Sequence, residues 1–194
     1  MKIEEAKRNI MEQIERLTVS LAEVQNRIES DDVINVSSPE SFYNIISAFS
    51  TQKRTPLSDK YIIRKLNMRP STMEEDCGDA VDANGKYYEL KTSFSNEKNC
   101  LNIRQLRPWQ RIDYYYCCFI DTNNFSNSVF FKLNKEQMKD EINRIGNPTH
   151  GSRKANLVNT NIEYSITLPI FDNKNENVIR WKNNYKIEGK DVFR

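Results

Sequence analysis

Two acidic side chains and one lysine near the middle of the chain have a spacing that could support chemistry. Asp79 is followed, after nine intervening residues, by Glu89-Leu90-Lys91. Asn84-Gly85 lies between two runs of alternating residues, which is a strong local signal for a β-hairpin. Side chains repeat on one face of a strand every second residue, so Glu89 and Lys91 share a face.

The register of this hairpin decides where Asp79 points. If a type I turn is closed by Gly85 in the left-handed region, the loop has three residues and Asp79 faces Glu89 across the strands. A strict two-residue loop would slip the register by one and turn Asp79 to the other face. The pairing of the two carboxylates therefore depends on the longer loop.

Two acids facing each other need a partner of opposite charge. Like charges directly opposite one another destabilise a plain hairpin. A hard divalent cation offsets that cost, because carboxylate oxygens are the ligands that magnesium prefers. A lysine beside such a site can stabilise charge that develops on a phosphate, or orient a water. The three residues thus predict metal-dependent phosphodiester hydrolysis.

The stretch from Gly78-Asp79 to Glu89-Leu90-Lys91-Thr92-Ser93 resembles the core motif of the PD-(D/E)xK nucleases, and most of all that of type II restriction endonucleases. The resemblance continues through residues 101–110 and the apolar run after them, and it covers about the central third of the chain. Gly78 stands where the name of the motif has proline.

The resemblance implies roles for these residues. Asp79 and Glu89 would hold Mg²⁺ together with the main-chain carbonyl of Leu90, and Lys91 would act on the attacking water or the transition state. Glu74 or Glu75 could reach a second metal, and Glu75 is the candidate we carry forward. The implied substrate is double-stranded DNA, cut by a homodimer at a short, roughly palindromic site.

The net charge of +2 is close to neutral, so a DNA-binding surface must come from local clustering. Residues 86–111 hold six lysines and arginines against two glutamates. The DNA contacts predicted in this stretch are Arg104, Gln105 and Arg107. A solvated, charged face of a helix is the alternative interpretation.

A polar loop over residues 147–160 is the second candidate DNA contact. His150, Arg153 and Lys154 in this loop have side chains suited to base edges and phosphates. Long loops within compact domains are usually functional or disordered. An ordinary surface loop is the alternative.

The elements that must position these residues follow from hydrophobic periodicity and turn signals. Residues 2–29 carry a seven-residue apolar repeat that predicts a long helix, packed across the domain or against a second subunit. Further helices are expected over 39–50, 56–67, 101–112, 134–145 and 178–185, and strands, besides the hairpin, over 113–121, 129–133 and 163–168. This order predicts an α/β fold with a mixed central sheet flanked by helices, divided into a helical region (1–70) and a catalytic core (71–194).

Cysteine usage and the lack of long apolar runs set the expected compartment. The four cysteines form no CxxC pair and there is one histidine, which disfavours a structural zinc site and favours a reducing environment. No targeting segment or membrane span is expected, so we predict a cytoplasmic protein without a membrane partner. Two other functions stay open: a repair or junction nuclease of the same superfamily, and a non-catalytic DNA-binding or coiled-coil adaptor that uses residues 2–29.

Overall fold

The computed structural model describes residues 36, 38–72, 77–95, 99–149 and 162–193, together with residues 7, 10, 11 and 13. Contacts divide the chain into Met1–Phe42 and Tyr43–Arg194. The helix predicted over 2–29 lies outside the described residues, apart from the four single positions. The division at residue 70 into a helical region and a catalytic core stays a prediction.

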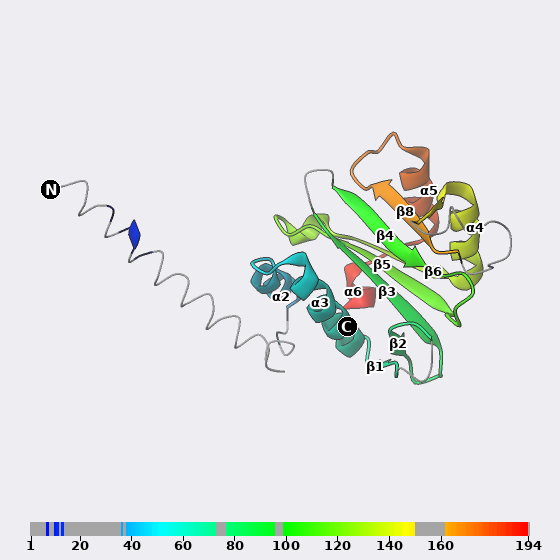
Figure 1. Cartoon of the computed structure of the whole chain (residues 1–194), viewed down its shortest axis with the longest axis horizontal. Coiled ribbons are helices and arrows are strands. Elements are labelled where there is room, and N and C mark those ends of the chain that lie inside the picture. Colours follow the sequence, from blue (N-terminus) through cyan, green and yellow to red (C-terminus); the bar gives the residue numbers. More distant parts are fainter. Residues whose placement is uncertain are drawn as a thin grey trace. The chain divides into compact units, whose positions relative to one another are not determined.

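A mixed six-stranded sheet forms the centre of the second unit, and a small sheet lies beside it (Figure 1). The strand order of the large sheet is β1-β2-β3-β5-β6-β9, in which β3 and β5 are parallel and the other neighbours antiparallel. The small antiparallel sheet has the order β4-β8-β7. The strands are β1 (Arg69–Pro70), β2 (Ala80–Val81), β3 (Tyr87–Phe94), β4 (Cys100–Leu106), β5 (Tyr114–Ile120), β6 (Val129–Asn134), β7 (Asn147–Pro148), β8 (Tyr164–Pro169) and β9 (Lys186–Ile187).

Five α-helices are described. They are α2 (Pro39–Ile46), α3 (Thr51–Lys65), α4 (Lys135–Ile145), α5 (Glu176–Asn184) and α6 (Gly189–Val192), and a short 3₁₀ helix covers Phe125–Asn127. None of the helices in the described part of the chain is both long enough and apolar enough to cross a bilayer.

Several elements form where local sequence predicts them. Strand β5 is buried at every position after its first, as expected for a strand covered on both faces. Asn134 caps the helix expected over 134–145, and it does so in a capping box: its side chain accepts from the Gln137 N–H at 2.9 Å, and the Gln137 side chain accepts from the Asn134 N–H at 2.8 Å. The α/β class and the mixed sheet are therefore confirmed.

The helix predicted over 101–112 is wrong, because residues 100–106 form strand β4. Leu101, Ile103 and Leu106 are buried, and the register against β8 shifts between Ile103 and Leu106. That bulge inserts one extra residue and places two buried positions three apart, which is also a helical spacing. The partner strand β8 lies about sixty residues further along the chain, so the local pattern alone could not reveal the pairing.

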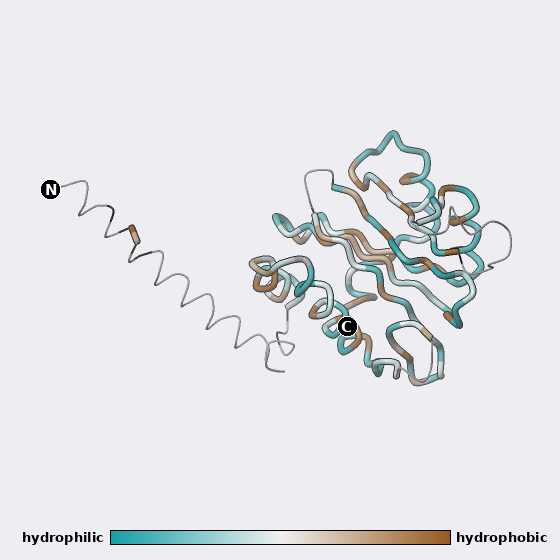
Figure 2. Tube along the Cα trace, in the orientation of Figure 1, coloured by the Kyte–Doolittle hydropathy of each residue, from teal (hydrophilic) through white to brown (hydrophobic). Residues whose placement is uncertain are grey.

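Each face of the large sheet is covered by different elements. The odd-numbered residues of β5 pack into a core with the small sheet, α4 and α5, which includes Cys117, Phe131 and Trp181. Helices α3 and α6 contact the strands β3 and β6. The hydrophobic residues of β5 run through the middle of this arrangement (Figure 2). The sheet is thus covered on both faces, and among the described strands none pairs with β3 on the β2 side beyond the two residues of β2.

Candidate active site

The hairpin has the longer loop that brings Asp79 and Glu89 together. Ala80 pairs with Tyr88 and Val81 with Tyr87, and Gly85 has a φ of 73°. The Gly85 N–H donates to the Asp82 carbonyl at 3.0 Å, which closes the turn. One step beyond this ladder, Asp79 lies opposite Glu89. Of the two registers that the sequence leaves open, the structure has the one with the three-residue loop.

Gly78 shapes the backbone that carries Asp79. Its φ is 47°, and a Cβ atom there would lie 2.4 Å from the Tyr88 carbonyl oxygen. Proline cannot adopt this φ and any side chain would collide with β3. The next residue donates its N–H to the same Tyr88 carbonyl at 2.7 Å. Glycine at this position therefore allows the close approach of Asp79 to β3.

The Asp79 carboxylate lies at the edge of β3. Its Oδ2 atom accepts from the Leu90 N–H at 2.8 Å. In a strand, the N–H and C=O of one residue point to the same edge, so the Leu90 carbonyl lies on the edge that Asp79 occupies. The carboxylate and the carbonyl named by the resemblance are thus on one edge.

Lys91 and Glu89 form a close ion pair. The Lys91 Nζ atom lies 2.6 Å from Glu89 Oε1, and both side chains are largely buried. Burial raises the pKa of Glu89, and nearby Asp79 raises it further, while Lys91 lowers it in part. Burial likewise raises the pKa of Asp79, against the lowering effects of the Leu90 N–H and Lys91. One lysine does not offset the cost of burying both acids.

A third carboxylate, Asp59 on α3, reaches the same cluster and was missed in the sequence. Its Oδ1 atom lies 3.5 Å from the Thr92 hydroxyl, and burial together with repulsion from Asp79 raises its pKa from 3.8 to about 7. A signal was present: Asp59 lies three and four residues before the buried Ile62 and Ile63, so an acid stands on the apolar stripe of a helix.

The donor set suits magnesium. Among the described residues, no three or more His, Cys, Asp and Glu side chains form a ready-made metal cage. Magnesium needs less than that, because proteins usually bind it through one or two carboxylates while several waters remain on the ion. Asp79, Glu89 and the Leu90 carbonyl can supply such oxygens. The candidate second-metal ligand Glu75, and Glu74, lie outside the described residues.

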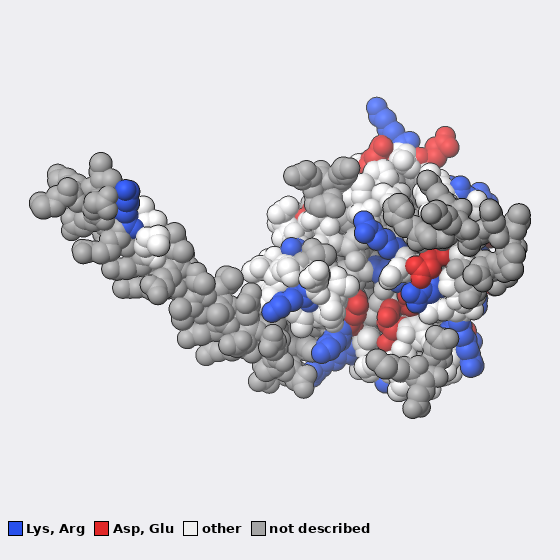
Figure 3. Space-filling model, in the orientation of Figure 1, with Lys and Arg blue, Asp and Glu red and all other residues white. Residues whose placement is uncertain are grey.

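Basic and polar side chains lie around the carboxylates. On the face shown in Figure 3, Asp and Glu side chains gather near the middle of the second unit with Lys and Arg around them. Lys60 and Arg64 are exposed on α3, and Arg104 and Gln105 are exposed on β4. Both elements contact β3, the strand that carries Glu89 and Lys91.

Of the remaining predicted DNA contacts, one lies in the described part of the chain and three lie outside it. Arg107 is half-buried and its Nε donates to Glu163 at 2.7 Å, so part of its hydrogen-bonding capacity is already used. Its charge also lowers the pKa of Glu89, which places it near the acids. His150, Arg153 and Lys154 lie outside the described residues.

The cluster can therefore hold a hard cation and place an ammonium group beside it. These are the requirements of phosphoryl chemistry in a partly buried site. Comparison of the chain with protein-family models gave no match, and comparison with curated protein sequences gave no significant match.

Proposed function

We propose that this protein is a magnesium-dependent endonuclease that hydrolyses phosphodiester bonds of double-stranded DNA, as a type II restriction enzyme does. The observation that carries the proposal is the close ion pair between Lys91 and Glu89 on β3, the strand whose Leu90 N–H donates to Asp79. The mixed α/β sheet around this pair supports the proposal of a restriction-endonuclease-like core.

Each residue of the site has its own role in the proposed reaction. Asp79, Glu89 and the Leu90 carbonyl bind the magnesium ion, which supplies Lewis-acid polarisation of the scissile phosphate. Lys91 holds its ammonium group beside Glu89, where it can bind a phosphate oxygen or orient a water. Asp59 can accept a proton at neutral pH, because its pKa is about 7.

Sequence-specific cleavage of both strands implies twofold symmetry. A homodimer matches a palindromic site, because each subunit then meets the same half-site. The cytoplasm is the compartment proposed for this activity. Sedimentation of the full chain with and without DNA measures the assembly state.

The first experiment incubates the full chain with phage DNA and Mg²⁺ and sequences the resulting ends. We expect discrete fragments with a common end sequence, and binding with little cleavage when Ca²⁺ replaces Mg²⁺, because calcium coordinates more loosely. Single nicks or unspecific digestion would point instead to a repair or junction nuclease. No cleavage under any of these conditions would contradict the proposal.

Matched variants on one hairpin locate the chemistry. Lys91→Ala should abolish cleavage and leave DNA affinity within about tenfold, or roughly 1.4 kcal/mol. Asp82→Asn is the control, since its side chain accepts from the Asn84 and Lys86 N–H groups within the turn. Full-rate cleavage by Lys91→Ala would remove this residue from the mechanism.

A further inference from the structure

Strand β4 exposes two consecutive side chains, which a regular strand does not do. Arg104 and Gln105 are both exposed, whereas Ile103 before them and Leu106 after them are buried. Side chains of a regular strand alternate between faces. The register shift against β8 falls between Ile103 and Leu106, so the bulge turns Arg104 and Gln105 to the same exposed side.

The backbone at the bulge is unusual for glutamine. Gln105 has a φ of 54°, in the left-handed region that glycine and asparagine occupy more readily. Within the described residues, the Gln105 side chain makes no hydrogen bond that would explain the choice of glutamine. Strained non-glycine residues of this kind cluster at functional sites, and the Gln105 side chain is exposed.

Contacts with β3 place this bulge beside the candidate active site. At one end of β4, the Ser93 hydroxyl accepts from the Asn102 N–H and donates to the Asn102 carbonyl, each at 2.9 Å. Just past the other end, Arg107 is near enough to Glu89 to lower its pKa. Arg104 and Gln105 therefore lie alongside the segment of β3 that carries Lys91.

We propose that Arg104 and Gln105 read base edges in the DNA major groove, an inference that rests on the proposed nuclease function. The major groove admits a pair of antiparallel strands, and β4 is an outer strand of the small sheet, paired antiparallel with β8. Arginine pairs with O6 and N7 of guanine, and glutamine with N6 and N7 of adenine. The bulge presents both side chains together, so the target site contains a guanine and an adenine close to one another.

Substitution of Gln105 by glycine separates readout from backbone geometry. Gln105→Gly allows the left-handed conformation and removes the side chain with its amide group. We expect a folded protein that still cleaves, with the preference for adenine at one position reduced about tenfold. A role for Gln105 in the backbone alone predicts unchanged specificity. Arg104→Ala should relax the preference for guanine at a neighbouring position by a similar factor.

Two controls match these variants. Asn67→Gly changes another exposed residue with positive φ, at 51°, and Arg144→Ala removes an exposed arginine from α4. Both should leave the preference unchanged.

The measurement is cleavage of a DNA library randomised around the site, together with binding to single-base variants at two salt concentrations. A wild-type enzyme that cleaves, with unchanged preference in both variants, would overturn the base-reading role and leave the proposed function intact. Equal weakening on all sequences with a smaller salt slope would instead assign phosphate contacts. A wild-type protein that cleaves no DNA would overturn the function and the inference together.

Discussion

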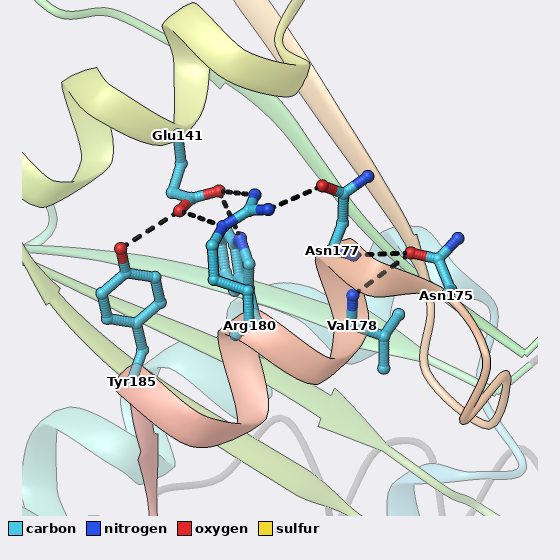
Figure 4. Close-up of polar contacts among 7 residues, drawn as sticks. Glu141, Asn175, Asn177, Val178, Arg180 and Tyr185 are labelled. Atoms are coloured by element: carbon cyan, nitrogen blue, oxygen red, sulfur yellow. Dashed lines mark hydrogen bonds and ion pairs between the residues drawn. The ribbon is translucent and has the colours of Figure 1, made fainter.

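Two groups of acidic side chains in this protein are partnered in opposite ways. Glu141 on α4 is almost fully buried, and four donor groups surround it: Nε and Nη2 of Arg180, the Trp181 indole N–H at 2.8 Å and the Tyr185 hydroxyl at 3.1 Å (Figure 4). In the other group, Asp59, Asp79 and Glu89 share one lysine and few further donors.

The pKa values reflect this difference. Hydrogen bonds and the charge of Arg180 lower the pKa of Glu141 despite its burial. Burial raises the pKa of Asp59, Asp79 and Glu89, because their donors are too few to offset the loss of water. A buried carboxylate whose oxygens are surrounded by hydrogen-bond donors stabilises a fold. Carboxylates with too few donors are suited to bind a cation or move a proton.

The largest expected effect is on activity. Glu89→Gln should reduce cleavage at least about a thousandfold, or about 4 kcal/mol in activation free energy, because it removes a charged metal ligand. The free energy of unfolding should stay the same or rise, because one of the repelling charges is gone. Cleavage rates and urea unfolding measure the two quantities. A clear loss of stability would mean that the acids support the fold as Glu141 does.

The second effect is on stability. Glu141→Gln should lower the free energy of unfolding by about 3 kcal/mol, because Arg180 would lose its charged partner in a buried setting. Glu136→Gln is the control on the same helix, since Glu136 is exposed and pairs with Lys139 at 2.9 Å; we expect less than about 0.5 kcal/mol there. Equal effects of the two variants would contradict the contrast between the acidic groups.

A third effect tests the backbone that holds Asp79. Gly78→Ala should cost about 2–3 kcal/mol of stability, because it combines a positive φ with a clash against the Tyr88 carbonyl. Gly85→Ala has a positive φ and nothing within 4 Å of the added Cβ, so it should cost about 1 kcal/mol. Chemical unfolding of both variants measures the difference. Equal costs would show that the close approach of Gly78 to β3 is unimportant.

The smallest effect is a dependence on pH. Asp59 has a folded-state pKa of about 7 against 3.8 for an unperturbed group, so its cost to stability appears as pH rises between these values and is complete above about 7. Asp59→Asn should therefore raise the free energy of unfolding by about 1–2 kcal/mol at pH 8, which allows for solvent screening, and change it little at pH 4.

The contribution of Glu141 to the free energy of unfolding depends on pH in the opposite sense. Its lowered pKa means that its contribution is present above the unfolded-state pKa and is lost as pH falls through the folded-state value. Urea unfolding of the wild type and both variants between pH 3 and 8 resolves the two trends. A stabilising effect of Asp59→Asn that does not change with pH would contradict the assignment.

Elements with local signals could be predicted from the sequence. Asn84-Gly85 predicted the hairpin and limited it to two registers, and the structure has the one that pairs Asp79 with Glu89. The capping box at Asn134 and the apolar run of β5 were equally local. In each case, residues within a few positions of one another satisfy their own hydrogen bonds or share one pattern of burial.

Strand β4 and the positions of Asp59 and Gly78 depend on contacts between distant segments. Residues 101–106 form a strand because β8, far along the chain, supplies the hydrogen bonds. The bulge interrupts the alternation of buried and exposed residues that would have indicated a strand. Asp59 joins the acids because α3 packs on β3, and Gly78 is needed because β3 passes within contact of it. Contacts between distant segments set these positions, and one-dimensional spacing does not encode which segments meet.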